Sequence, residues 1–366
     1  MHIFLKILLA LLIALLLFGL WFINQPQMDP LMTAERRSHI EASPHYVNGE
    51  FVPIHPHEPV KPTGDFWKEF LFPTPGKTIP KGIMISDRTD LKTLDPEKDV
   101  VVWMGHSSFY MQLHGKKILI DPINDLYASP VWGIDKAMEG SRLYDPEDIP
   151  DDIDVMVLSH DHWDHLDYDF VRAIEPKVKH VVTGLGNGGY YEKWGYPLEK
   201  IHEEDWWTPV VIDETLTVYV LPTRHVSGRL LHRNQTLPAS FAFVTADKRV
   251  YYTGDGGYDD RFLEIGEKLG PFDVALIEDG QYNTAWHSVH MLPEEGARAA
   301  EELLSKAVIP CHNGKYPLSI HNWKEPYERM VEASKDKSYT LFTPKMGEAV
   351  EIGNLHQSFE KWWEQG

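Results

Sequence analysis

A cluster of metal-ligand side chains follows a short apolar run in the middle of the chain. Residues 159–166 read Ser-His-Asp-His-Trp-Asp-His-Leu, directly after the run Asp-Val-Met-Val-Leu at 154–158. That run is short, rich in β-branched residues and bounded by polar ones, which predicts a buried strand. Open α/β sheets usually carry their chemistry on loops that leave the carboxyl ends of strands. Because imidazole and carboxylate groups suit zinc and other borderline divalent ions, the segment predicts an α/β fold with a metal site at a sheet edge.

The spacing within the cluster divides its members into groups. His160 and His162 alternate, so on an extended segment both rings point to the same side and can bind one ion. Asp164 and His165 lie just beyond them and can turn toward a second ion. Asp161 falls on the opposite side of the alternation, which favours a surface position or a role in orienting a ligand.

Three later strand-like runs end in the same way. His225 follows the run 216–221, Asp255 follows the run 249–254, and Cys311 and His312 follow the run 307–310. Adjacent residues on a strand diverge, so His312 is the expected ligand and Cys311 the expected buried thiol. Four strand-like runs therefore end in candidate ligands, and together they predict one metal centre.

The other polar motifs are less specific. His106 follows another strand-like run and either orients a ligand or packs. His290 and His321 lie close in sequence to the predicted site, where a substrate-facing or ligand-supporting role and a structural role both stay open. Residues 184–189 match Gly-x-Gly-x-x-Gly, but they lie mid-chain without a ribose-binding carboxylate at the usual distance, so we interpret them as a turn into a helix.

Residues 1–23 predict a hydrophobic membrane anchor. Residues 7–23 are apolar and uncharged, with Lys6 before them, and their length is at the short end for a spanning helix. No Ala-x-Ala site follows, so an uncleaved anchor is favoured over a cleaved secretory signal. We expect a single anchor in a bacterial inner membrane with the catalytic domain in the periplasm, although Arg36 and Arg37 after the span favour the reverse orientation.

Composition divides the rest of the chain into an arm, a catalytic domain and a tail. Residues 24–99 carry eleven prolines and little periodicity, which predicts an arm over the domain surface rather than a part of the core. Residues 100–354 alternate short strands and helices, as expected for the catalytic domain. Residues 355–366 are expected to form a C-terminal tail.

Charge and cysteine content limit the partners. The formal net charge of −20 argues against nucleic acid, because phosphate neutralisation needs clustered Lys and Arg. An anionic substrate is still allowed, since a two-metal centre supplies its own positive charge. With Cys311 as the single cysteine, an intramolecular disulfide is excluded. The oligomeric state stays open, a homodimer included.

The motifs resemble those of the metallo-β-lactamase superfamily, whose signature His-x-His-x-Asp-His matches residues 160–165. A closer resemblance, spanning roughly residues 100–345, is to N-acylphosphatidylethanolamine-hydrolysing phospholipase D and its bacterial membrane-anchored relatives. The segments that carry it, in family order, are 103–108, 121–122, 158–168, 205–207, 254–258, 270–273, 290–295 and the segment around His312. The chain departs from the family at Val226, at Asn313 and at 278–280, which flank the pocket and bear on lipid specificity.

The resemblance implies an αββα sandwich with a dinuclear zinc centre. One zinc would be held by His160, His162 and His225, the second by Asp164, His165 and His312, with Asp255 bridging both. The ligands alone also permit iron or manganese. His290 would lie beside the substrate phosphate.

The expected function is that of a phosphodiesterase of phospholipase D type. It would act on N-acylated phosphatidylethanolamine or a related membrane phospholipid through a metal-bridging hydroxide. Asp164 and Asp255 would orient the hydroxide, and His290 and His321 would hold the phosphoryl oxygens. The alternatives are a metallo-hydrolase of an ester, lactone or β-lactam, and a membrane-anchored regulatory protein that retains the metal site.

Overall fold

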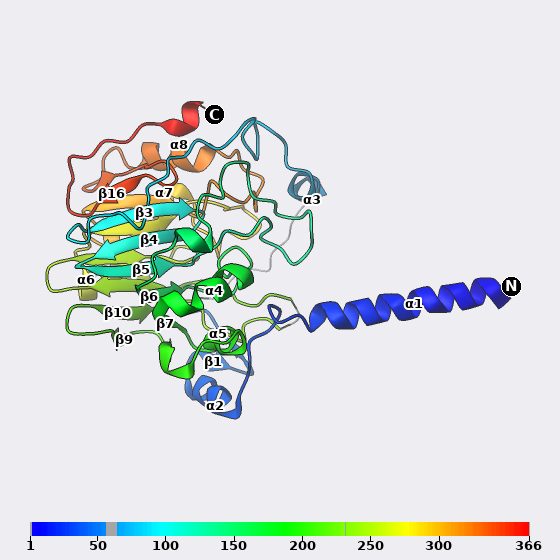
Figure 1. The fold of residues 1–366 in the computed structure, drawn as a ribbon. Coiled ribbons are helices and arrows are strands. Elements are labelled where there is room, and N and C mark those ends of the chain that lie inside the picture. Colours follow the sequence, from blue (N-terminus) through cyan, green and yellow to red (C-terminus); the bar gives the residue numbers. More distant parts are fainter. Residues whose placement is uncertain (1, 56–63, 231, 366) are drawn as a thin grey trace.

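Two mixed sheets stack face to face in the computed structural model, which describes residues 2–55, 64–230 and 232–365 (Figure 1). The first sheet has the strand order β16-β3-β4-β5-β6-β7-β8 and the second has the order β15-β14-β13-β12-β11-β10-β9. The strands of the first sheet are β3 (Val100–Gly105), β4 (Ser108–Leu113), β5 (Lys116–Ile120), β6 (Ile153–Leu158), β7 (Val178–Gly184), β8 (Ile201–Glu204) and β16 (Ala349–Glu351). Those of the second are β9 (Thr208–Val211), β10 (Thr217–Leu221), β11 (Ser240–Val244), β12 (Arg249–Tyr252), β13 (Val274–Glu278), β14 (Ala307–Cys311) and β15 (Thr340–Leu341).

Each sheet is antiparallel in one half and parallel in the other. In the first sheet β5, β6, β7 and β8 run parallel, and in the second β12, β13, β14 and β15 do. The carboxyl ends of neighbouring parallel strands lie at one edge of a sheet. This topology therefore gathers the loops after β6, β12 and β14, which carry most of the predicted ligands.

Side-chain alternation along the strands creates three apolar layers. On β6, Val155 and Val157 enter the core between the sheets, whereas Met156 and Leu158 point to the opposite face. On β12, Tyr252 faces the inter-sheet core and Tyr251 faces outward. Since both faces of each sheet are buried, helices must cover the outer faces.

The helices meet this requirement and complete the αββα sandwich predicted from the sequence. Their bounds are α1 (His2–Ile23), α2 (Ala34–Ala42), α3 (Gly64–Leu71), α4 (Tyr168–Ile174), α5 (Gly188–Lys193), α6 (Arg261–Leu269), α7 (Pro293–Glu302) and α8 (Glu325–Ala333). Residues of α4 and α5 pack on the outer face of the first sheet, and residues of α6, α7 and α8 pack on that of the second (Figure 1). The turn predicted at 184–189 does lead from β7 into α5.

The prediction that residues 24–99 stay out of the core is wrong for part of this Pro-rich arm. Ile40, Phe51 and Met84 are buried and belong to the inter-sheet core. Phe51 lies on a short hairpin of β1 (Tyr46–Val47) and β2 (Glu50–Phe51). Ile40 stands alone between polar residues, and Phe51 and Met84 lie in short apolar runs, so no periodicity marks them.

A buried arginine fixes the arm to the domain. Arg36 on α2 is 2.7 Å from Glu192 and 2.7 Å from Glu203, and it also donates to the carbonyl oxygen of Leu31. A buried guanidinium needs such partners because taking a charge out of water is costly. The arm is thus a structural part of the domain rather than a loose covering.

The C-terminal segment also differs from the expected tail. Trp362 and Trp363 are buried in the inter-sheet core, and Trp362 lies 6.2 Å from Trp103 between ring centroids. Trp363 stacks on Tyr327 of α8. The tail closes the core beside β3, although its sequence is too short to show a period.

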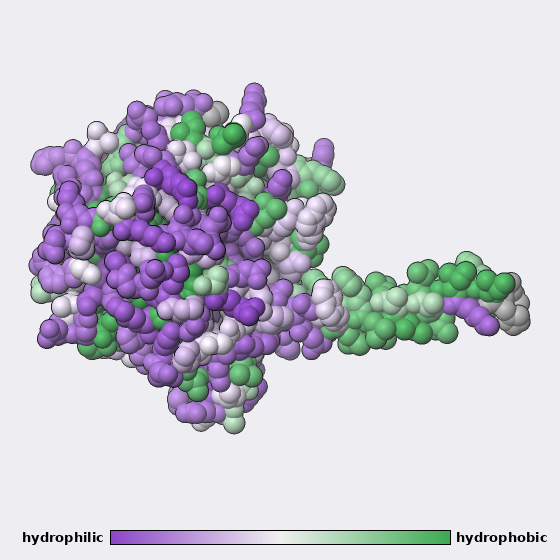
Figure 2. Space-filling view, viewed as in Figure 1, coloured by the Kyte–Doolittle hydropathy of each residue, from purple (hydrophilic) through white to green (hydrophobic). Residues whose placement is uncertain are grey.

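Helix α1 stands away from the sandwich (Figure 1). Its residues 3–23 have a mean hydropathy of 2.9 and none of that span is buried in the protein. The helix is long and apolar enough to cross a membrane, as an anchor or as part of a signal sequence. Figure 2 shows its apolar surface beside a largely hydrophilic domain.

Candidate metal centre

The seven predicted ligands meet between the two sheets. The loop after β6 carries His160, His162, Asp164 and His165, whereas His225, Asp255 and His312 follow β10, β12 and β14 of the second sheet. Their ligand atoms, together with those of His106, Glu278 and His290, form four overlapping groups. Within each group all ligand atoms lie within 4.8 Å of one another. The groups are His160, His162 and His225; His160, His165 and Asp255; His106, Asp164, His165 and His312; and Asp255, Glu278, His290 and His312. The fold therefore brings together residues that lie as much as 152 positions apart, from 160 to 312.

The first group is a cluster of three imidazoles. Nδ1 of His162 lies 2.9 Å from Nε2 of His160 and 3.2 Å from Nε2 of His225. His225 donates from Nδ1 to the carbonyl oxygen of Val289 at 3.0 Å, which leaves its Nε2 as an electron-pair donor. Burial lowers the pKa of His160 and of His225 well below the ordinary value and that of His162 to about 4. Neutral imidazoles facing one another are the ligand form that zinc binds.

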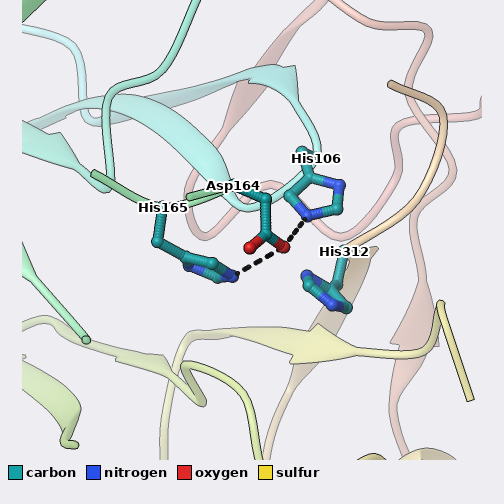
Figure 3. A group of neighbouring side chains, drawn as sticks. All are labelled: His106, Asp164, His165 and His312. Carbon is teal, nitrogen blue, oxygen red and sulfur yellow. Dashed lines mark hydrogen bonds and ion pairs between the residues drawn. The ribbon is translucent and has the colours of Figure 1, made fainter. Parts of the chain in front are cut away.

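The second group surrounds a carboxylate. Asp164 Oδ2 is 2.7 Å from Nε2 of His106 and 3.4 Å from Nε2 of His165, and the ring of His312 lies beside them (Figure 3). Burial alone lowers the pKa of His165, but Asp255, Asp164 and Asp121 raise it well above the ordinary value. The carboxylates thus favour a positive charge at this point, which a divalent ion supplies.

Asp255 lies between the two groups. Its Oδ2 is 3.1 Å from Nε2 of His165, 3.2 Å from Nε2 of His312, 3.8 Å from Nε2 of His160 and 3.9 Å from Nε2 of His225. Burial, together with Glu278, raises the pKa of Asp255 to about 7. A carboxylate at the centre of four imidazole nitrogens is positioned to bridge two cations.

Buried polar atoms that lack a hydrogen-bond partner indicate whether these residues fit a metal ion. Asp255 Oδ1 and His312 Nε2 are among the buried side-chain atoms of the described residues that have no hydrogen-bond partner. Buried polar atoms are nearly always satisfied, so such atoms call for an ion or a water. Both belong to the ligand groups, and the donor set fits a divalent metal.

Asp121 is a site residue that reasoning on individual ligands overlooked. Its carboxylate accepts from His165 Nδ1 at 2.7 Å, from the Ser159 backbone N–H at 2.7 Å, from the Tyr252 hydroxyl at 2.6 Å and from the Ser159 hydroxyl. A carboxylate on the distal nitrogen fixes the tautomer and orientation of a metal histidine. Asp121 follows β5 directly, so the rule of a polar residue after a strand could have found it.

Glu278 is a second such residue, noted in the sequence only as a departure from the family. It is fully buried at the end of β13, where its Oε2 accepts from the Gly256 N–H at 2.8 Å and its Oε1 bonds to Nδ1 of His290. His290 in turn lies 5.0 Å from His225 and 5.3 Å from His312 between ring centroids. The structure brings His290 to the centre, with its orientation set by Glu278.

His321 lies elsewhere. Its Nε2 accepts from the Gln281 N–H at 2.9 Å, its Nδ1 donates to the carbonyl oxygen of Asn322 at 3.0 Å, and its ring stacks on Tyr282. Both ring nitrogens are engaged, and His321 belongs to none of the ligand groups found among the described residues. Its catalytic role stays a prediction without a supporting contact.

The structure shows the contacts of His106 and Asp161, for which the sequence left two roles open. Nε2 of His106 lies 2.7 Å from Oδ2 of Asp164, so the ring is placed to orient a predicted ligand rather than only to pack. Asp161 is buried, not on the surface, and accepts from the Tyr190 hydroxyl at 2.9 Å and the Gly228 N–H at 2.7 Å. Asp161 thus links the loop after β6 to Tyr190 and Gly228.

The two-sheet sandwich and the histidine–aspartate centre define a metal-dependent hydrolase. The family described as "Beta-lactamase superfamily domain" matches residues 116–313. The chain belongs to this family, the metallo-β-lactamase superfamily, as the sequence motifs indicated.

Three relatives illustrate the similarity. An uncharacterized protein of Mycobacterium tuberculosis is 38% identical over 278 residues, which cover 74% of this chain and 73% of that protein. The N-acyl-phosphatidylethanolamine-hydrolyzing phospholipase D 1 of Caenorhabditis elegans is 33% identical over 279 residues, 69% of this chain and 75% of that one. Among solved structures, Igni18, a metallo hydrolase of Ignicoccus hospitalis, has a TM-score of 0.52 at 20% identity and covers 69% of this chain and 97% of its own. The last likeness supports the fold alone.

Proposed function

We propose that the protein is a dinuclear zinc phosphodiesterase of phospholipase D type, acting on N-acylated phosphatidylethanolamine or a related membrane phospholipid. The position of Asp255 carries the proposal, because its Oδ2 lies 3.1–3.9 Å from imidazole nitrogens of both ligand groups. The similarity to the nematode phospholipase over most of both chains supports the substrate class.

The proposed ligands divide as the geometry suggests. His160, His162 and His225 would hold one ion, Asp164, His165 and His312 the other, and Asp255 would bridge them. Two ions in such a site supply a nucleophilic water at neutral pH and stabilise charge on a phosphoryl group. The imidazole-rich set favours zinc, and iron or manganese in its place is an outcome that the metal analysis below distinguishes.

The chain's own groups supply orientation and proton transfer. Asp164 and Asp255 lie at the centre as acceptors for the proton of an attacking water. His290, held at Nδ1 by Glu278, presents its Nε2 edge as a hydrogen-bond partner for a phosphoryl oxygen. Tuned acid and base groups within hydrogen-bond reach of the reacting atoms are what such a reaction requires.

The cavity at the centre limits what can enter it. It measures about 120 Å³ and is lined by the centre and by Gln281, Trp286 and Leu318. Sites that enclose a whole small molecule measure about 300–1,000 Å³. The cavity therefore admits a phosphodiester group, whereas the acyl chains of a lipid must lie outside it.

Metal content and turnover test the proposal together. The parent, His162→Ala and Asp255→Asn proteins are compared with His180→Ala, a half-buried histidine that pairs with His202 outside the centre. We expect two zinc ions per chain and chelator-sensitive release of phosphatidic acid from N-acylphosphatidylethanolamine vesicles in the parent and in His180→Ala. Both should be lost or strongly reduced in the two centre variants.

Other results would overturn the proposal in distinct ways. Ring opening of a lactone or β-lactam, or ester cleavage, without phosphatidic acid would indicate acyl chemistry. A fully loaded centre that acts on no member of the panel would indicate a regulatory protein. Full activity in both centre variants would refute the ligand assignment.

We also propose that residues 1–23 anchor the protein in a bacterial inner membrane with the domain in the periplasm. The unburied apolar helix α1 supports a membrane location. A reporter that is active only outside the cytoplasm, fused after Gly366, should give signal. Signal from a cytoplasmic reporter instead would invert the topology.

A further inference from the structure

Large apolar side chains lie exposed on helix α3 and on the loop after β5. On α3 and just beyond it, Trp67 and Phe72 are 50% and 75% exposed. On the loop, Val131 and Trp132 are 44% and 83% exposed. Exposed aromatic residues in two neighbouring segments are unusual on a soluble surface and indicate an interaction site. We call these residues, together with Leu71 and Leu126, the apolar rim.

The two segments of the rim flank one groove. This groove measures about 760 Å³, and Leu71 lines it from α3 while Leu126 and Gly133 line it from the loop. Pro317 also lines the groove, and the next residue, Leu318, lines the cavity at the metal centre. The groove that the rim flanks therefore lies beside the cavity at the centre.

Helix α3 also packs against a residue that lines the centre's cavity. Phe66 is buried and meets the ring of Trp286 edge-on, with ring centroids 5.0 Å apart. Trp286 lines the cavity together with His290. The helix thus packs one aromatic face against the site and leaves Trp67 and Leu71 uncovered.

Helix α1 leaves the domain on this same side. The segment after α1 is fixed where it begins, since Pro26 accepts from the Trp194 indole at 3.0 Å and Gln27 accepts from Arg229 at 3.0 Å. Arg229 and Trp194 follow β10 and α5, at the edge of the sandwich that carries the metal loops. Figure 1 shows α1 and α3 projecting on one side of the domain, and Figure 2 shows hydrophobic residues along that side.

We propose that the apolar rim is a second membrane contact, which inserts into the interface of the bilayer that α1 crosses. A spanning α1 places the bilayer on this side of the domain, and the short fixed segment after it keeps the domain close. Tryptophan is enriched at the membrane–water interface, where an amphipathic ring is stable. The rim then holds the entrance of the metal centre against the lipid surface.

The rim binds a bilayer rather than a second copy of the chain. A second copy docked on this face would have to share the space next to α1 with the lipid. The proposal rests on α1 lying in a membrane and not on the identity of the substrate, so its test needs no turnover.

Single-cysteine labelling of the full-length protein in phosphatidylcholine–phosphatidylglycerol vesicles tests the proposal. Cys311 is fully buried, so an environment-sensitive thiol dye reacts only with an introduced cysteine. Val131→Cys and Leu71→Cys report on the rim. Val211→Cys is the matched control: Val211 is 68% exposed and pairs with Thr217 at the start of β10, at the opposite end from the metal loops.

We expect the dyes at positions 131 and 71 to shift to shorter emission wavelength and to lose emission when the vesicles carry a quencher on the lipid. The dye at position 211 should show neither change. Equal behaviour at 131, 71 and 211 would overturn the proposal. A blue shift without lipid quenching would also overturn it, because it would show that protein, such as a second copy, covers the rim.

Discussion

Replacing Asp121 by asparagine should weaken metal binding although Asp121 is not a ligand. The carboxylate accepts four hydrogen bonds, two of them from the His165 ring at 2.7 Å and the Tyr252 hydroxyl at 2.6 Å. Asparagine has nearly the same shape but presents an N–H₂ donor in place of one oxygen. Where that donor faces His165 Nδ1, the ring must accept at Nδ1 and carry its proton on Nε2, the nitrogen that faces Asp255.

The magnitude follows from what such orienting carboxylates contribute. Removing the carboxylate partner of a metal histidine typically costs about 10- to 100-fold in metal affinity, which corresponds to about 1.4–2.8 kcal/mol. The measurement is a competition titration of the full chain against a metal-binding dye, with circular dichroism to compare the folded state.

Asp161→Asn is the control for this experiment. Asp161 is a buried carboxylate in the same metal loop, but its oxygens bond to Tyr190 and Gly228 rather than to an imidazole. It should lose folding stability comparably and keep nearly the parental metal affinity. Parental affinity in Asp121→Asn, or an equal loss in Asp161→Asn, would refute the reasoning.

Three further predictions concern stability, each measured by urea unfolding in detergent. Arg36→Met leaves Glu192 and Glu203 without their cation and should lower the free energy of unfolding by about 3–5 kcal/mol. Replacing the exposed Arg37 by methionine should change it by no more than about 0.5 kcal/mol. Equal effects of the two substitutions would contradict the buried ion pairs. Trp362→Ala should cost about 3–5 kcal/mol by opening the core, and a negligible change would show that the tail contributes nothing. Burial lowers the pKa of Lys315 to about 7 from 10.5, so the unfolded chain binds a proton that the folded chain lacks between these values and stability rises with pH there. Lys315→Met should flatten that rise, and an unchanged slope would contradict the assignment.

The cluster of predicted ligands was accessible from sequence because its members follow strands whose composition is distinctive. His160, His225, Asp255 and His312 all come directly or shortly after an apolar run, and the parallel topology then brings such positions together. Asp121 obeys the same rule. It was missed because a single aspartate before a proline carries little signal until His165 is seen beside it.

What sequence could not supply are contacts that depend on the tertiary fold alone. Ile40 and Phe51 of the arm and Trp363 of the C-terminal segment enter the core from apolar stretches of one or a few residues. No period of 2 or 3.6 residues marks them. The pairing of Glu278 with His290 likewise joins the end of β13 to a loop twelve residues later, so neither residue alone indicates it.

The pairing of segments far apart in the sequence constrains the stage of synthesis at which the protein can fold. Strand β3 pairs with β16, near the C-terminus, and Arg36 pairs with glutamates more than 150 residues later. During synthesis the arm emerges early, yet its partners in α5 and β8 appear only after the first sheet is nearly complete. Trp362 and Trp363 are synthesised later still, and they close the core beside Trp103. Since domains generally fold as units, the nascent chain would keep an unfinished core until Trp362 and Trp363 have been synthesised. A ribosome stalled before Trp362 would thus carry a chain whose inter-sheet core is still open.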